Sequence, residues 1–227
     1  MALLGPEEQK IVKERLAGLT REVEMVLFTN SSRLLVGGQE PCMYCQETEQ
    51  LMRELEPLSD QLSLVVHDLA TLEGKEAARE AGVDTAPTLI LREKGSTSTN
   101  LRYLGIPAGY EFSSLLEDLE MIGGEGHGLA PDVVSMLQSL AEEVKMQVFV
   151  TPTCPYCPAA VRTAHRFAYA SPKVLGEMVE AQEFPQLASR YQISGVPDTI
   201  INGRERVLGA QPLPVFLEAV EKVSKGA

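Results

Sequence analysis

Short apolar runs rich in Val, Leu, Ile and Phe alternate along the chain with segments that carry helix-start signals. The runs at 23–29 and 146–151 predict β-strands. Pro6 and Pro131 each lie in the predicted first turn of a helix, where the missing N–H of proline costs nothing. Because strands alternate with helices, the pattern predicts an α/β fold whose sheet is at least partly parallel.

Each half of the chain has the same order of predicted elements. An opening helix, a strand, a helix that starts at a Cys-x-x-Cys motif, a second strand and a short helix come first. An X-Pro step, a strand–turn–strand segment and a closing helix follow. The later elements lie at 62–66, 74–80, 88–92 and 111–122 in the first half, and at 174–179, 184–191, 199–202 and 214–225 in the second. Turns at Gly95 and Gly203 predict an antiparallel hairpin in each half.

Several landmarks recur at a similar distance, which indicates an internal duplication. The motif at Cys42 returns 112 residues later at Cys154. The X-Pro segment 83–90 returns 110 residues later at 193–200, and the Leu-Gly step at 104–105 returns 104 residues later. Each match is weak alone, but the shared order is hard to obtain by chance.

The segment Gly123–Gly128 holds four glycines in six residues and is the predicted joint between the two copies. We therefore expect a first domain at residues 1–124 and a second at 125–227, each of a common domain size. The first copy also carries ten extra residues, Asn30–Gln39, directly before its cysteines. This insertion could shield the first motif or shape a docking surface.

Charge and composition exclude several classes of protein. The 227 residues include 20 Lys plus Arg and 32 Asp plus Glu, for a net charge of −12. So acidic a chain gains little from counterion release on phosphates, and with 5% aromatic residues and no Trp it has few groups for base stacking. We therefore expect no nucleic-acid partner. The acidity is concentrated in residues 1–124, where 21 acidic residues face 11 basic ones, against 11 and 9 in residues 125–227.

The start of the sequence lacks a basic region and turns acidic at once, which is not typical of a secretory signal. No apolar run approaches the roughly 18 residues that span a bilayer. These two observations predict a soluble, cytoplasmic protein with no membrane partner.

The four cysteines form two Cys-x-x-Cys motifs, Cys42–Cys45 and Cys154–Cys157. On the first turn of a helix, this spacing brings the two sulfurs together, and the helix N-terminus stabilises the thiolate of the first cysteine. That thiolate attacks in thiol–disulfide exchange, and the second cysteine resolves the mixed disulfide. Structural zinc is the alternative, because paired Cys-x-x-Cys motifs also bind zinc. Since 108 residues separate Cys45 from Cys154, we favour redox chemistry and expect no metal.

Charge distinguishes the two motifs. Glu40, Glu47 and Glu49 flank the first motif, whereas no acidic residue occurs in the sequence from 145 to 176 around the second. Like charges disfavour a thiolate, so we expect Cys154 to be the more acidic nucleophile and the second site the faster one. The same window contains basic side chains that we expect to form only a solvated helix face, namely Arg162, His165 and Arg166.

A strand, a Cys-x-x-Cys helix and an apolar residue before proline resemble the thioredoxin and glutaredoxin fold. Cys154-Pro155-Tyr156-Cys157 has the glutaredoxin form of the motif. Two units in tandem resemble the glutaredoxin-like protein disulfide oxidoreductases of thermophilic archaea and bacteria. The stretches that carry this resemblance are Tyr103–Phe112, Phe149–Pro158 and Leu175–Ala181. It implies two tandem thioredoxin-like domains, each a central mixed β-sheet flanked by helices.

The resemblance also implies roles for residues beside the cysteines. Ala86–Pro87 and Val196–Pro197 would be cis bonds, and the backbone before each proline would pair with the substrate peptide. Tyr44 and Tyr156, the aromatic residues of the motifs, would flank the bound substrate; ordinary partial burial is the alternative for both. The first motif departs from the family, because it has Met43 in place of proline and the insertion before it.

The resemblance implies an enzyme, a protein disulfide oxidoreductase that exchanges disulfides with client proteins in cell redox homeostasis. Its catalytic residues would be Cys42, Cys45, Cys154 and Cys157. It would need no organic cofactor, because the electrons reside on the cysteines, and would take electrons from a thioredoxin-reductase-like flavoenzyme. Two alternatives stay open: an electron-relay module of a peroxide-reducing system, and a non-enzymatic scaffold with structural zinc at the cysteines.

Overall fold

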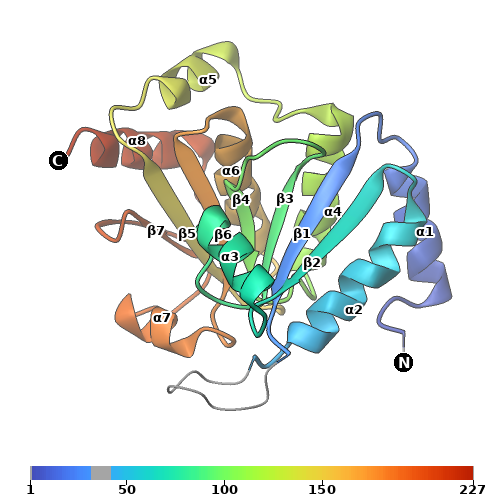
Figure 1. Ribbon diagram of the computed structural model, residues 1–227. Helices are drawn as coiled ribbons and strands as arrows, with labels where there is room; N and C mark the ends of the chain where they lie inside the picture. The colour runs from blue at the N-terminus through green and yellow to red at the C-terminus, as the bar shows by residue number, and fades with distance from the viewer. Residues whose placement is uncertain (1, 32–41, 227) are drawn as a thin grey trace.

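The protein folds around one eight-stranded mixed sheet in the order β2-β1-β3-β4-β6-β5-β7-β8. A computed structural model describes residues 2–31 and 42–226 (Figure 1). The first half contains α1 (Pro6–Leu16), β1 (Val23–Thr29), α2 (Cys45–Leu55), η1 (Glu56–Leu58), β2 (Leu62–Asp68), α3 (Leu72–Ala81), β3 (Thr88–Glu93), β4 (Leu101–Leu104) and α4 (Glu111–Glu120). The second half contains α5 (Pro131–Gln138), β5 (Val144–Val150), α6 (Cys157–Ala170), β6 (Val174–Glu180), α7 (Pro185–Arg190), β7 (Asp198–Ile201), β8 (Glu205–Leu208) and α8 (Leu213–Ser224).

The two halves repeat the same strand pairing. In the first half β1 pairs parallel with β2 and antiparallel with β3, and β4 completes a hairpin with β3. In the second half β5 pairs in the same way with β6 and β7, and β8 completes the hairpin. The predicted α/β class, the duplication and both hairpins are therefore confirmed.

The edges of the two halves meet inside the sheet, where β4 pairs parallel with β6 from Leu101 opposite Gly176 to Leu104 opposite Val179. The two predicted sheets are thus one continuous sheet. The joint between the halves follows α4 as the single-turn η2 (Met121–Glu125), in which Gly124 has a φ of 152°. The division into domains at residue 124 stays a prediction.

Helices cover the two faces of the sheet unequally. The larger hydrophobic core lies under α1, α2, α4, α6 and α8, and its residues include Val12, Met52, Leu115, Val161 and Phe216. Of the described helices, α3 and α7 cover the opposite face, and they lie on the same side of the sheet in Figure 1. A small apolar cluster packs under each of these two helices, and the strand surface between the clusters carries polar side chains.

A turn of the first half packs against the loop that precedes the second cysteine motif. The backbone N–H of Tyr110 donates to the carbonyl oxygen of Pro152 at 3.0 Å, and the N–H of Ile106 donates to Glu183 Oε1 at 2.6 Å. Gly109 has a φ of +62°, and a side chain there would overlap the Pro152 carbonyl group. The backbone of the first half therefore supports the second site directly.

The expected solvated helix face on α6 is wrong for His165. This side chain is fully buried, its Nδ1 lies 2.5 Å from Asp118 Oδ2, and its Nε2 lies 3.1 Å from the carbonyl oxygen of Arg102. The reason is the contact between the halves, because α4 covers this face of α6 and supplies the partner carboxylate. Arg162 is half-exposed and pairs with Glu117.

Among the described residues, no helix is long and apolar enough to cross a membrane. The insertion at Asn30–Gln39 lies outside the described residues from position 32 onward, so its predicted effect on the first motif stays a prediction.

Candidate redox-active sites

The first cysteine motif lies where the chain leaves β1 and enters α2. Cys45 is the first residue of the helix, Cys42 precedes it, and the two are disulfide-bonded with Cα atoms 5.6 Å apart. Cys45 is buried at 3% exposure, whereas Cys42 is partly exposed. The backbone N–H of Asn30 donates to Cys45 Sγ at 3.2 Å. Cys42 is therefore the more exposed cysteine of this motif.

The second motif has the same arrangement with deeper burial. Cys157 begins α6, Cys154 precedes it, and their Cα atoms are 5.5 Å apart in a second disulfide. Cys157 is fully buried and Cys154 is 7% exposed. Cys154 Sγ lies 3.7 Å from the carbonyl oxygen of Val196. This contact brings two of the predicted site residues together.

The peptide bonds Ala86–Pro87 and Val196–Pro197 are both cis, as the resemblance implied. Both prolines are buried, while Ala86 and Val196 are partly exposed. Ala86 lines the same groove as Cys42, so the first site also joins its cysteine to the residue before its proline. The substrate-pairing role of these residues stays a prediction.

Tyr44 and Tyr156 occupy equivalent places at the start of α2 and α6. Tyr44 is 39% exposed and Tyr156 is 70% exposed. Both rings are accessible to a partner at the edge of a cysteine motif, and their contact with substrate stays a prediction.

A buried carboxyl group lies close to the second site and comes from the first half. Glu111 begins α4 directly after Tyr110, whose backbone contacts Pro152. Burial raises the pKa of Glu111 to about 7, and the hydroxyl of Ser114, which donates to Glu111 Oε2, opposes this only in part. Glu111 is therefore a buried carboxyl group with a raised pKa at the turn that packs against the loop before the second motif.

The same helix holds a buried polar network between the halves. Asp118 accepts a hydrogen bond from the Tyr103 hydroxyl and contacts His165, which lies two helical turns after Cys157. Burial, and next the charge of Asp118, raise the pKa of Tyr103 well above its ordinary value. The network fixes α6 against β4 and α4.

The first site has a corresponding carboxyl group from the second half. The pKa of Glu183 is raised to about 7, chiefly by burial; the hydrogen bond from the Ile106 N–H lowers it in part, and the nearby charges of Glu180 and Glu47 add to the increase. Glu47 lies in the first turn of α2, so Glu183 reaches the surroundings of the first motif. Sequence reasoning missed Glu111 and Glu183. Glu183 follows β6, at the edge of the sheet where the parallel strands end. Because functional residues often gather at that edge, this position is the signal by which the sequence could have indicated Glu183.

The described residues contain no group of three or more His, Cys, Asp or Glu side chains that could hold a metal ion. The cysteines pair with each other within each motif, and their separate positions at the ends of β1 and β5 do not form one four-cysteine site.

Comparison with known proteins gives relatives at the level of sequence and of fold. A family model described as a thioredoxin domain matches residues 144–222. The structure superposes with a TM-score of 0.87 on a protein disulfide oxidoreductase from Aeropyrum pernix, at 30% identity over 98% of this chain and 94% of that one. The chain belongs to the family of protein disulfide oxidoreductases with tandem thioredoxin folds.

Two further relatives match parts of this chain. A thioredoxin from Methanocaldococcus jannaschii is 37% identical over 81 residues, which are 35% of this chain and 95% of that thioredoxin. The F component of alkyl hydroperoxide reductase from Xanthomonas campestris is 27% identical over 158 residues, which are 70% of this chain and 27% of that protein. The chain spans about a third of the length of the first curated relatives it matches.

Proposed function

We propose that this protein is a thiol–disulfide oxidoreductase that exchanges disulfides with client proteins through both cysteine motifs. One observation carries the proposal: in each half a Cys-x-x-Cys disulfide at a helix N-terminus lies beside a partly exposed residue before a cis proline. The first cysteine of each motif and the adjacent stretch of backbone would together offer a client disulfide a nucleophile and a binding edge.

The reduced second site would transfer two electrons to a client. The Cys154 thiolate attacks one client sulfur, the Cys154–client bond forms, and the client disulfide breaks. The departing client thiolate takes a proton. The Cys157 thiolate then attacks Cys154 Sγ, which restores the protein disulfide and releases the second client thiol. Cys42 and Cys45 would act in the same way, and the reverse sequence would oxidise a client dithiol.

We expect the second site to be the more reactive of the two. The first turn of α6 contains no acidic residue, whereas the first turn of α2 contains Glu47. Positive charge at a helix N-terminus stabilises a thiolate, and a nearby carboxylate weakens that effect. Glu183 adds a second carboxyl group to the surroundings of Cys42.

Insulin reduction by the full chain tests this proposal, with the wild type compared with Cys42→Ser and Cys154→Ser. Cys154→Ser should lose most of the activity and Cys42→Ser should keep a large part of it. Full activity in Cys154→Ser would contradict the assignment of the second site. No activity in the wild type would contradict the function itself.

An electron-relay role in a peroxide-reducing system is the second candidate, and the match to the F component of alkyl hydroperoxide reductase favours it. A relay would pass electrons to one dedicated peroxidase faster than to insulin. Stopped-flow oxidation of the reduced protein by a peroxiredoxin-type disulfide protein and by insulin distinguishes the two candidates.

The remaining assignments follow from the main proposal. The cysteines carry the electrons, so the chain would need no bound organic cofactor, and a thioredoxin-reductase-like flavoenzyme would reduce them. We place the protein in the cytoplasm, where such a reductant keeps the sites cycling.

A further inference from the structure

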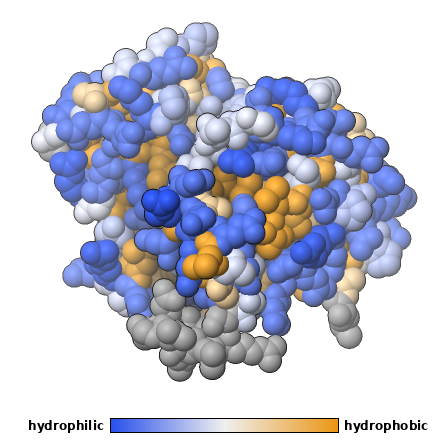
Figure 2. Space-filling model, viewed as in Figure 1, coloured by the Kyte–Doolittle hydropathy of each residue, from blue (hydrophilic) through white to orange (hydrophobic). Residues whose placement is uncertain are grey.

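A groove of about 1100 Å³ opens on the face of the sheet between α3 and α7. Figure 2 shows this face in space-filling form: it is mostly hydrophilic, and apolar residues reach the surface in smaller patches. The groove exists because the two helices cover the ends of this face and leave the junction of β4 and β6 open. Its volume is at the upper end of the range of small-ligand pockets and its walls come from both halves, so it has room for a short polypeptide segment.

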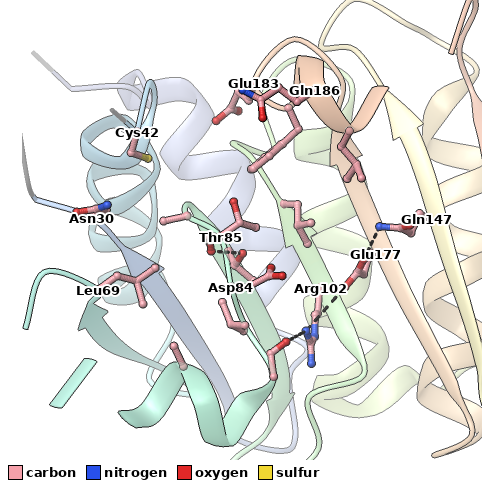
Figure 3. A pocket seen from close by; sticks show the side chains of 18 of the residues that line it. Asn30, Cys42, Leu69, Asp84, Thr85, Arg102, Gln147, Glu177, Glu183 and Gln186 are labelled. Atoms are coloured by element: carbon pink, nitrogen blue, oxygen red, sulfur yellow. Dashed lines mark hydrogen bonds and ion pairs between the residues drawn. The ribbon is translucent and has the colours of Figure 1, made fainter. Parts of the chain in front are cut away.

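Polar side chains with their own partners form the floor of the groove (Figure 3). Glu177 pairs with Lys145 at 2.9 Å and accepts a hydrogen bond from Gln147 at 3.0 Å. Arg102 donates to the carbonyl oxygens of Ala81 and Gly82 at 2.7 and 2.8 Å. Each of these groups has a partner, and the two cations Lys145 and Arg102 outnumber the one carboxylate of Glu177, so the floor carries a small positive charge.

The first redox site lies at one end of this groove. Cys42 and Ala86 both line it, so a segment bound there would pass the sulfur and the backbone before the cis proline. In Figure 3, Cys42 lies on one side of this end and Glu183 on the other. The groove is therefore continuous with the reactive site and has walls from both halves.

Three cations line the walls: Lys75 and Arg79 from α3, and Arg190 from α7. All three are exposed, and none has an ion pair within the part of the chain that the structure describes. The acidic residues of α3, Glu73, Glu76 and Glu80, are not among the residues that line the groove. The helix thus presents its basic side to the groove, although the first half has a net charge of −10.

Among the residues that the structure describes, two acidic ones line the groove as well, Asp84 and Glu183, apart from the paired Glu177. Glu183 lies at the end next to Cys42, and it is partly protonated near neutral pH because its pKa is about 7. The three unpaired cations therefore outnumber these two acidic residues, and the described part of the walls is positive.

We propose that the groove is the docking surface of the first redox site and that its occupant is an extended client segment with acidic residues next to its disulfide. Lys75, Arg79 and Arg190 would select that segment by charge. The inference rests on the proposed function, since it assumes that Cys42 exchanges disulfides with a client.

The test uses the full chain with Cys154→Ser and Cys157→Ser, so that only the first site turns over. The substrates are two synthetic peptides with the same internal disulfide, flanked by three Glu or by three Lys residues. Dithiothreitol is the reductant, and its uncatalysed rate is subtracted. Three exposed charge pairs predict a roughly tenfold higher kcat/KM for the acidic peptide at low salt. This preference should fall as salt screens the charges.

Two charge-reversal variants test the residues. Lys75→Glu, Arg79→Glu and Arg190→Glu together should abolish or invert the preference, and neutral Gln at the same positions should abolish it. The matched control carries Lys10→Glu, Lys13→Glu and Arg204→Glu, which make the same change in net charge outside the groove. The control should keep the preference, and circular dichroism checks that each variant folds.

The outcomes separate the inference from the function. If the first-site protein reduces both peptides equally, or if the groove and control variants change the preference alike, the docking surface is wrong and the oxidoreductase function stands. If neither this protein nor the wild type reduces either peptide or insulin, the proposed function fails.

Discussion

The two redox sites share their local geometry and differ in their surroundings. Each has a cysteine pair at a helix N-terminus, with Cα atoms 5.6 and 5.5 Å apart, beside a cis proline. The first site opens into a groove with charged walls and leaves Cys42 partly exposed, whereas the second site is packed so that Cys154 is 7% exposed. Duplication thus preserved the reacting geometry while access and charge diverged.

Each of the two sites also has a buried carboxyl group near it that comes from the opposite half. Glu111, on the first half, lies next to the turn that supports the second site, and Glu183, on the second half, reaches the first site. Burial raises the pKa of both carboxyl groups to about 7. A carboxyl group of each half therefore lies near the cysteine motif of the other half.

The most direct test of the difference between the two sites is to disturb the packing that supports one site alone. Gly109→Ala adds a Cβ that overlaps the Pro152 carbonyl group at a residue whose φ is +62°. We expect a loss of roughly 2–4 kcal/mol in the free energy of unfolding, from backbone strain and overpacking together. The activity of the second site, measured on insulin in the Cys42→Ser background, should fall with it.

Gly95→Ala is the matched control for this substitution. Gly95 also has a positive φ, +82°, but a Cβ there would meet nothing within 4 Å. Its cost should be only the strain, roughly 1–2 kcal/mol, with both sites fully active. Equal losses in urea unfolding for the two variants would show that the contact with Pro152 does not support the second site.

The sequence predicted those features of the site that depend on local spacing. The cysteine pairs, the helix starts and the residues before proline each lie within a few positions of one another, so a motif specifies them. Glu111, Glu183 and His165 could not be found in this way. Their environments depend on the pairing of β4 with β6, which joins strands from different halves. This contact buries polar side chains that the sequence of one half alone would place in solvent.

The buried carboxyl group of Glu111 should make the free energy of unfolding depend on pH. Its pKa is about 7 in the folded protein and near 4.5 in the unfolded chain. Between pH 4.5 and 7 the unfolded chain releases this proton while the folded protein keeps it. Its contribution to the free energy of unfolding is therefore fully present below pH 4.5 and is lost as the pH rises through 7.

Glu111→Gln removes this dependence. The difference in the free energy of unfolding, variant minus wild type, should be roughly 1–3 kcal/mol larger at pH 8 than at pH 4. The variant is thus relatively more stable at the higher pH. Urea unfolding of the oxidised protein is the measurement, because disulfide-bonded cysteines do not titrate. Glu7→Gln, an exposed carboxylate on α1, is the control and should show no such difference. If the free energy of unfolding changes with pH in the same way in the wild type and in Glu111→Gln, Glu111 does not cause this pH dependence.

Alkylation of the reduced protein compares the two nucleophiles directly. Exposure favours attack at Cys42, whereas the absence of acidic residues in the first turn of α6 favours the thiolate of Cys154. Access sets the plateau rate and thiolate stability sets the midpoint of the pH profile, so iodoacetamide labelling across pH separates them. We expect the midpoint for Cys154 to lie lower, with a thiolate fraction roughly tenfold larger at pH 6. A lower midpoint for Cys42 would reverse the order of the two sites.

The smallest effect concerns the charge beside Cys42. Glu47 is exposed in the first turn of α2, where its carboxylate opposes the positive end of the helix. Glu47→Gln should raise the thiolate fraction of Cys42 at pH 7 roughly twofold, since interactions between exposed charges are weak. The same labelling experiment measures this, and the increase should disappear at high salt. Asp132→Asn changes the same charge in the first turn of α5, which lies far from α2 in Figure 1, and should leave Cys42 unchanged. If both variants change the thiolate fraction of Cys42 equally, the net charge of the protein, and not the local carboxylate, causes the difference in thiolate stability between the two sites.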